Sequence, residues 1–295
     1  MKHFISVSSV LILFAANGYA QTAASPAGGR YMGGLLDHAS RYGQFWFPEP
    51  LRGPEMDVDR EFRLDWFHGE KRGNQQDEVT AEIEYNIGLL TLEVEAGYER
   101  SADASFDALS GRTIRQTEDG FGSIELSARH PIYQYVTADG FFDYTLVAAL
   151  EVAIPSNTKV SKDTEIVPQL FQLMRFGEHF SVQTSVGYSA LIGGDEGGAS
   201  SLEYNVVLGY NLEHDELPLP GILRTIPIFE LNGDWGLSRE ETGHNTLFGT
   251  AGVRLNFVSV GAAQPRIGLG YVFPIDRGAR DELRWGVITS LVFEF

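Results

Sequence analysis

The chain contains no cysteine among its 295 residues. Disulfide bonds, thiolate metal sites and cysteine nucleophiles are therefore excluded. Basic residues are also scarce, with 22 Lys and Arg against 40 Asp and Glu, which gives a formal net charge of −18. Because nucleic acid and anionic lipid surfaces repel negative charge, neither is expected as a partner that this chain binds through its overall charge.

Long hydrophobic runs are lacking too, so the sequence predicts no transmembrane helix. The one apolar run, residues 4–16, follows Lys2 and leads into the small residues Gly18 and Ala20. This order of charge, apolar run and small residues is typical of a secretory signal peptide, and the run is shorter than the roughly 20 residues that span a bilayer. We predict a signal peptide over residues 1–20, cleaved near Ala20, with an uncleaved anchor as the alternative.

Alternation of apolar and polar residues is abundant. In "EIEYNIGLLTLEVEAGYE", Ile83 and Tyr85 alternate with glutamates, and Leu92 and Val94 do the same after a short turn. Strict alternation of this kind predicts half-buried β-strands. The pattern recurs in twelve segments, near residues 58–69, 78–86, 89–100, 120–130, 141–154, 166–176, 180–191, 201–212, 223–237, 247–258, 265–275 and 283–295.

The connections between these segments alternate between tight turns and long polar loops. Residues 86–88 and 177–179 predict tight turns, whereas residues 101–119 and 155–165 predict long loops. The sixth segment is the weakest, because Pro168 interrupts it. Strands of about ten residues with one polar and one apolar face are typical of a membrane barrel. The prediction is an all-β protein with a twelve-stranded antiparallel transmembrane β-barrel over residues 57–295; a soluble β-sandwich is the alternative.

Aromatic residues at the strand ends favour the barrel, because two aromatic belts mark the membrane interfaces. The last strand, "LRWGVITSLVFEF", ends on an apolar ring, and a barrel would place Phe295 at the periplasmic interface with lipid. Closing this strand against the first would remove both sheet edges, as hydrocarbon requires. The expected outer belt is Trp66, Tyr98, Tyr188, Trp235, Phe273 and Trp285, and the expected inner belt is Tyr85, Tyr144, Phe180, Tyr210, Phe257 and Phe295.

Two stretches resemble known families. The closing "VFEF" is similar to the C-terminal signature of bacterial outer-membrane proteins, which implies that the barrel-insertion machinery recognises Phe295. "LVAALEVAIPSNTKV", followed by "TEIVPQLFQLMRFGEHFSVQTSVGYSALIG", resembles the middle of the transporter-like outer-membrane proteins of the MetA phenol-degradation type, including the pair Gly187 and Tyr188. This resemblance covers residues 146–192. It implies an outer-membrane barrel of about this size with a transport role, and it brings no catalytic residue.

Residues 21–56 differ from the rest of the chain. Small residues come first, and "GQFWFPEPLRGPE" then combines an aromatic triplet with prolines, which excludes a central strand. The segment is interpreted either as a periplasmic tail that packs against the barrel rim or as a plug that enters the lumen. A processed linker is the third possibility. The candidate plug anchor is Phe45, Trp46 and Phe47.

Charged residues on the polar face of the strands would line the lumen in two groups. Because an isolated buried charge costs several kcal/mol, these residues must be hydrated or paired. The hypothesis is an outer-membrane channel or substrate-selective transporter that passes small solutes through a narrow, charge-lined lumen. The alternative is a closed lumen held together by salt bridges, in a structural or surface ligand-binding protein. The acidic wall is Glu82, Glu84, Glu93, Glu95, Glu99, Glu125 and Glu151, and the basic wall is Arg63, Arg224, Arg254, Arg266 and Arg284.

No enzyme is predicted. His179 and Ser181 superficially resemble the His-x-Ser arrangement of outer-membrane phospholipase. However, the alternation points both side chains toward the lumen, and the sequence shows no neighbour that would orient the histidine. The other histidines are scattered without ligand spacing, so neither a metal nor a cofactor is expected. The expected partners are outer-membrane lipid, the insertion machinery and a small-molecule solute.

Overall fold

The computed structural model describes residues 28–31, 47–54, 60–71, 74–87, 89–107, 112–156, 160–194, 197–238, 242–261 and 263–295, and it describes their side chains except in 28–31 and 103–116. The predicted signal peptide and two members of the candidate plug anchor, Phe45 and Trp46, lie outside the described residues. Among the helices described, none is long and apolar enough to cross a membrane.

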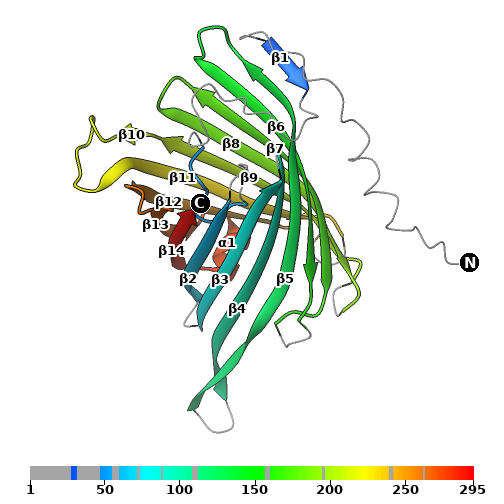
Figure 1. The fold of residues 1–295 in the computed structure, drawn as a ribbon. Helices are drawn as coiled ribbons and strands as arrows, with labels where there is room; N and C mark the ends of the chain where they lie inside the picture. Colours follow the sequence, from blue (N-terminus) through cyan, green and yellow to red (C-terminus); the bar gives the residue numbers. More distant parts are fainter. Residues whose placement is uncertain are drawn as a thin grey trace, which may run out of the picture.

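The described strands form a closed, antiparallel, twelve-strand β-barrel, which confirms the predicted fold class (Figure 1). All twelve predicted segments correspond to strands of the ring. These are β2 (Glu61–Lys71), β3 (Asn74–Ile87), β4 (Leu90–Asp107), β5 (Arg112–Val136), β6 (Phe142–Ile154), β7 (Thr164–Phe176), β8 (Phe180–Ile192), β9 (Ser200–Tyr210), β11 (Ile222–Gly236), β12 (Asn245–Phe257), β13 (Gln264–Pro274) and β14 (Trp285–Glu294).

The ring closes where the last strand meets the first. β14 pairs with β2 from Trp285 opposite Glu70 to Glu294 opposite Glu61. Two short strands lie outside the ring. β1 (Gly28–Tyr31) pairs with the C-terminal end of β5, and β10 (Leu212–Glu213) pairs with β11. Closure pairs the described strands of the ring on both sides, as a chain surrounded by hydrocarbon requires.

One detail of the predicted strand boundaries was wrong, and the weakest predicted strand was confirmed. Residues 101–119 are not a long loop: β4 continues to Asp107 and β5 begins at Arg112, so paired strands extend through most of this segment. The sixth segment is a full 13-residue strand, β7. Its bridge pattern to β8 skips Val167 and Pro168, in keeping with the missing proline N–H, while Pro168 still faces Leu150 on β6.

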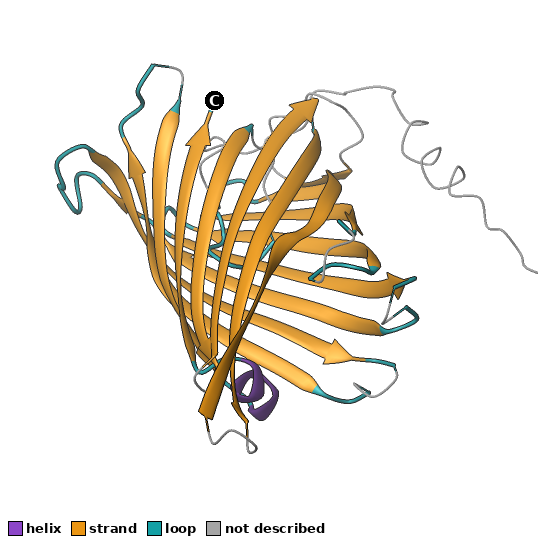
Figure 2. Cartoon of the chain, turned by 90° about the horizontal axis from the view of Figure 1, so that it is seen from below, coloured by secondary structure: helices purple, strands orange, loops and turns teal. Residues whose placement is uncertain are grey.

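The barrel has two ends, and the helix lies at only one of them (Figure 2). At one end β2 meets β3, β4 meets β5, β6 meets β7, β8 meets β9 and β11 meets β12, and the helix α1 (Arg277–Glu282) lies there too; we call it the loop end. The opposite end holds the connections at 88–89, 137–141, 177–179, 211–221 and 258–263, together with Phe295; we call it the turn end.

The helix α1 (Arg277–Glu282) caps the loop end beside β12. Its N-cap, Asp276, accepts hydrogen bonds from the Ala279 N–H at 2.9 Å, the Asn245 side-chain amide at 2.6 Å and the Leu247 N–H at 3.1 Å. Burial alone would raise the pKa of Asp276, but these hydrogen bonds outweigh it and bring the pKa below its ordinary value. The helix is therefore fixed to the barrel through an ionised cap.

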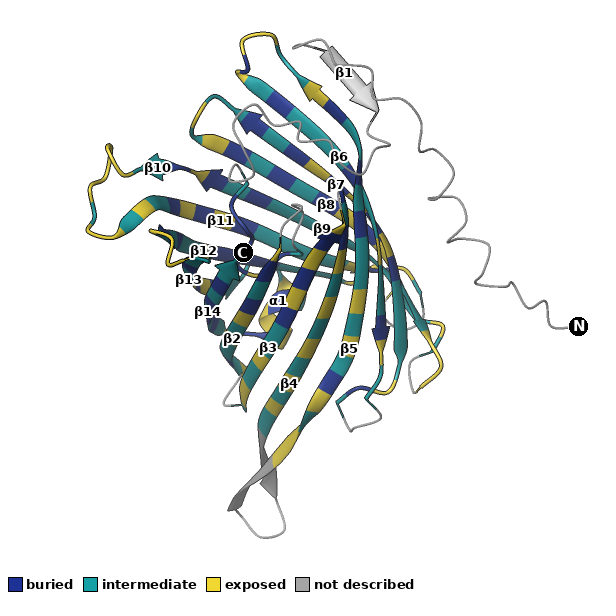
Figure 3. Ribbon diagram, viewed as in Figure 1, coloured by how far each residue is buried: buried dark blue, intermediate teal, exposed yellow. Residues whose placement is uncertain are grey.

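Exposed and more buried residues alternate along the strands, as the bands of colour in Figure 3 show. Outward side chains such as Ile83, Val94 and Leu269 are exposed and apolar, whereas the residues next to them on each strand point inward. Aromatic rings gather near the turn end, where the centroid of Phe142 lies 5.1 Å from Phe176, which in turn lies 6.0 Å from Phe180. An apolar band bordered by aromatic rings is the outer surface expected of a membrane barrel.

Candidate functional site in the lumen

Carboxylates line one side of the lumen, from β3 to β6. Residues two apart on a strand share a face, so the alternation seen in the sequence brings every second residue inward. Like charges gathered in this way repel one another, so the wall needs cations or water beside it. The inward carboxylates on this wall are Glu82 and Glu84 on β3, Glu93 and Glu95 on β4, Glu125 on β5 and Glu151 on β6.

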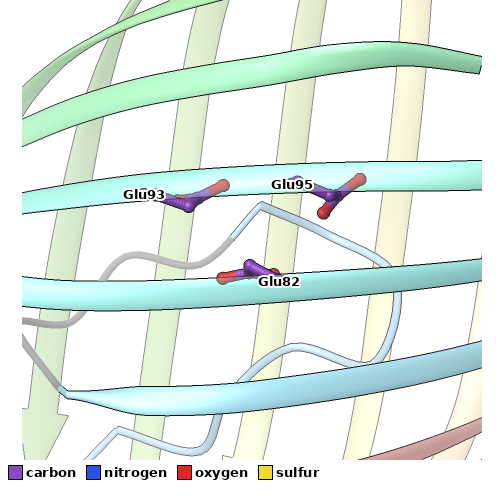
Figure 4. Close-up of side chains that lie close together, drawn as sticks. All are labelled: Glu82, Glu93 and Glu95. Carbon is purple, nitrogen blue, oxygen red and sulfur yellow. The ribbon is translucent and has the colours of Figure 1, made fainter.

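The strand register places these acids directly opposite one another. Glu82 faces Glu95 and Glu84 faces Glu93 between β3 and β4, and Glu95 also faces Glu125 on β5. One carboxylate oxygen from each of Glu82, Glu93 and Glu95 lies within 4.8 Å of the others. Figure 4 shows the three side chains close together on two neighbouring strands. A hard cation can bridge oxygens at such a spacing, but acidic clusters are common without one. The register thus concentrates negative charge at the middle of the wall.

Two arginines partly neutralise this side of the lumen. Arg129 on β5 is buried and forms ion pairs with Glu84 and, at 2.9 Å, with Glu93. Arg63 on β2 forms an ion pair with Asp65 at 2.7 Å. Paired charges of this kind can stay ionised away from bulk water, whereas a lone charge could not.

Residues 47–54 pass through the lumen on the opposite side. Leu51 is fully buried in an apolar cluster with Val207, Ile226, Ile228, Phe248, Val272, Ala279, Leu283 and Ile288. The methyl groups of Leu51 lie against the backbone at three glycines of β12 and β13. A Cβ added at Gly252, Gly268 or Gly270 would lie 2.4, 2.5 or 3.0 Å from them. Glycine at these positions therefore creates the space that Leu51 fills.

An acidic residue of this segment meets the basic wall. The carboxylate of Glu49 forms ion pairs with Arg254 at 2.6 Å and with Arg266, and all three side chains are buried. Arg254 also donates hydrogen bonds from Nε to the Glu49 carbonyl at 3.1 Å and from Nη2 to the Pro50 carbonyl at 2.8 Å. The second terminal nitrogen of Arg266 binds Glu294 on β14. The segment thus covers two arginines of the basic wall, Arg254 and Arg266.

A buried carboxylate of the barrel holds the backbone of the same segment. Glu230 on β11 accepts hydrogen bonds from the N–H groups of Leu51, Arg52 at 3.0 Å and Gly53 at 3.1 Å. Gln183 on β8 donates to the Pro48 carbonyl at 2.6 Å. Backbone groups that would otherwise be stranded inside the lumen are therefore paired with side chains of the strands.

A cavity of about 240 Å³ lies between the acidic wall and the segment. Arg52 borders it, with its guanidinium 4.6 Å above the ring of Phe248 and 5.5 Å from that of Phe67. The lining is mostly polar and ionisable, and it includes Glu78, Glu82, Glu93, Glu95, Glu125, Glu151, Arg63 and Arg129.

Some predicted wall residues lie apart from the cavity. Arg284 precedes β14 at the loop end, where its side chain is 73% exposed and lies 3.5 Å from Glu70. Arg224 is near the turn end and forms an ion pair with Glu213 on β10 at 2.7 Å. Glu99 lies on β4 toward the loop end, across from Gly120. The inward basic residues that the segment covers are Arg63, Arg254 and Arg266.

The other predicted candidates are placed as follows. Phe47 is partly buried and packs against a second apolar cluster, formed by Val147, Phe171 and Leu173. His179 pairs through Nδ1 with the Asn211 carbonyl at 2.8 Å, and the Ser181 hydroxyl donates to the Gly209 carbonyl at 3.4 Å. His179 Nδ1 also lies 3.6 Å from Glu216 Oε2, so the expectation that this histidine has no orienting neighbour was wrong.

Sequence reasoning missed Glu49 and Gln183. Glu49 lies between two prolines in a segment without periodicity, and Gln183 is one polar residue among several on the inner face of β8. The available signal for Glu49 was an acid between two prolines in the otherwise apolar run of residues 45–51.

No family model matches this sequence, and no curated protein does. Solved structures do match. The COG4313 outer membrane channel from Pseudomonas putida F1 aligns with a TM-score of 0.54 at 15% identity, covering 84% of this chain and 100% of that one. The NanC porin aligns with a TM-score of 0.47 at 9% identity, covering 80% of this chain and 98% of that one. The likeness to the COG4313 channel shows a shared fold, that of a bacterial outer-membrane β-barrel, as the sequence predicted.

Proposed function

We propose that this protein is an outer-membrane channel that carries small polar solutes through its lumen. The observation that carries the proposal is the contrast between the two faces of the strands from β2 to β6. Their inner side chains surround a cavity of about 240 Å³ with ionisable groups, while the outer side chains are apolar. Water and ions can occupy such an interior, and a band of lipid can surround the exterior.

The proposed location is the bacterial outer membrane, after removal of residues 1–20 near Ala20. The turn end would face the periplasm, because short turns and both chain ends are typical of that side. Phe295 lies at this end and is 55% exposed. It would be available to lipid and, during assembly, to the insertion machinery.

We assign the role of a plug to the N-terminal segment 21–56, on the basis of the contacts of residues 47–54. Glu49 covers two arginines of the basic wall, while the acidic wall still faces the cavity. With the plug docked, the open space is therefore lined by more acids than bases and should favour cations. Without the plug, both walls would face the solute.

The second candidate is a closed barrel with a structural role. The observation that favours it is the complete burial of Leu51 in an apolar cluster that also includes residues of five strands and α1. In a permanently filled lumen, the charged residues would only form salt bridges that hold the strands together. The two candidates predict different responses when carboxylates are removed.

Ion conductance in planar bilayers tests the proposal. The wild-type protein should form narrow channels that prefer cations, and replacing Glu95 and Glu125 together with Gln should lower the cation-to-anion permeability ratio without preventing assembly. Glu178→Gln, at the exposed turn between β7 and β8, is the matched control and should change nothing. A folded barrel that conducts no ions, with or without residues 21–56, would favour the closed structural protein instead.

A further inference from the structure

The carboxylate of Glu49 occupies a pocket that is built by the barrel. Arg254 on β12 is fully buried and Arg266 on β13 is 4% exposed. Their guanidinium groups converge on the two oxygens of one carboxylate, with Arg254 Nη1 2.6 Å from Glu49 Oε2 and Arg266 Nη1 on Oε1. Planar guanidinium groups match the geometry of a carboxylate better than that of a spherical anion.

Neighbouring strands fix the orientation of both arginines. Arg254 Nη1 lies 3.4 Å from the hydroxyl of Ser290 on β14, and Arg266 Nη2 binds Glu294 on the same strand. Asn256, the cross-strand partner of Arg266, is 5% exposed, and its amide oxygen has no hydrogen-bond partner in the described part of the chain. The pocket therefore offers two cations and one free acceptor in a buried setting.

We infer that the pocket of Arg254, Arg266 and Asn256 is a binding site for small carboxylate solutes, and that Glu49 occupies it as an internal ligand. This inference rests on the proposed channel function, because the solute that binds in the pocket would be a solute that the channel transports. A hydroxyl or ammonium group next to the solute's carboxylate would match the free oxygen of Asn256. The solute would have to displace Glu49 before it binds.

Displacement by a solute is a competition with a tethered group. A carboxylate on a short tether acts at an effective concentration of the order of millimolar, so a free carboxylate should compete in about that range. Once Glu49 leaves, the plug keeps its hydrogen bonds to Glu230 and the burial of Leu51 but loses two ion pairs. A carboxylate solute would thus loosen the plug and bind the wall in the same step.

Chemical rescue tests the pocket. Glu49→Ala removes a CH₂–COO⁻ group, which has the shape of acetate. The readout is trypsin cleavage after Arg52, followed by mass spectrometry on folded protein in detergent, because the bond after Arg52 must leave the lumen to be cut. Loss of the buried ion pairs should speed this cleavage by the order of 100-fold. Sodium acetate should slow it again, with half of the effect at roughly millimolar concentration, whereas chloride at equal ionic strength should not.

The wild-type protein should respond in the opposite direction. Acetate competes with Glu49 there and should accelerate cleavage. Glu49→Gln is the matched control, because its side chain fills the pocket and leaves no room for acetate. Rescue should also disappear when Arg266→Gln is combined with Glu49→Ala. The inference is overturned if acetate and chloride act alike on either protein, or if rescue survives the loss of Arg266.

Two further arrangements keep the test decisive. If Glu49→Ala folds poorly, the refolding yield on heat-modifiable gels replaces proteolysis: acetate should raise the yield, and an equal yield in chloride would overturn the inference. Cleavage is measured without any current. A barrel that shows rescue but never conducts defeats the channel proposal alone, and a barrel that conducts without rescue defeats the carboxylate pocket alone.

Discussion

Replacing Gly268 with Ala should release the plug. The added Cβ would lie 2.5 Å from Cδ2 of Leu51, closer than real Cβ contacts allow, while its next neighbours, Ser290 Cβ and Arg254 Cζ, are 3.2 and 3.5 Å away. Leu51 cannot move far within its cluster, because Gly252 and Gly270 already confine its other methyl group. Expelling a fully buried leucine costs about 1.5–3 kcal/mol, which is roughly a 10- to 150-fold shift toward the undocked plug.

Trypsin cleavage after Arg52 measures this shift, since the cleavage rate follows the undocked population when opening is fast. The matched control is Gly97→Ala on β4, where an added Cβ would meet Thr80 and Glu78 at 3.7 and 3.8 Å, which is ordinary contact. Gly97→Ala should cleave at the wild-type rate. Equal rates for the two variants would show that Leu51 does not hold the plug in the lumen.

Three other outcomes are expected. Leu92→Arg should prevent assembly where Leu92→Met does not, because a cation on the lipid face costs about 2–4 kcal/mol near the midplane; heat-modifiable gels show the difference. Cys at Thr242, at the loop end, should react with an impermeant thiol reagent on intact cells, and Cys at Ala138, at the turn end, only after lysis; the reverse would invert the orientation. Asp276 has a lowered pKa, so the stability that its ionised form gives α1 is present above the ordinary pKa of 3.8 and is lost as the pH falls through the lower folded value. Hydrogen exchange at Ala279 should speed up in that acidic range, and an unchanged protection factor would contradict this coupling.

The fold could be predicted from the sequence because each strand carries its own signal. Alternation assigns each residue of a strand to one face of the sheet, and a shift by one residue would put every side chain on the wrong face. Leu92 and Glu93 could therefore be placed on opposite faces from the local sequence alone. The extension of the hairpin through residues 101–107 and 112–119 was not predicted, because the second of these runs, "RTIRQTED", is almost entirely polar and shows no apolar alternation. Pro168 was misleading because a strand tolerates one missing N–H where the pairing to β8 is interrupted.

The site could be predicted only in part, for a physical reason. Which strand a residue occupies follows from local sequence, but which charges meet depends on register and on what fills the lumen. Arg284 has the right parity and still lies at the rim, because its strand begins one residue later. Glu49 lies outside the strands, so alternation assigns it neither an inward nor an outward face. Its position follows from contacts more than 200 residues away in the chain, which no local pattern reports.

The charges of the lumen explain why residues 47–54 lie where they do. Buried arginines such as Arg254 and Arg266 need anions beside them, and Glu294 supplies one to Arg266. A plug that brings a carboxylate to this side gains ion pairs, whereas the same carboxylate against Glu82 and Glu95 would be repelled. The plug backbone adds N–H donors, which match Glu230, and an apolar side chain, which matches the glycines beneath Leu51. The plug neutralises Arg254 and Arg266 and leaves the acidic wall uncovered. A barrel with a docked plug and a barrel with a displaced plug should therefore differ in ion preference, and the reversal potential under a salt gradient would report which state is present.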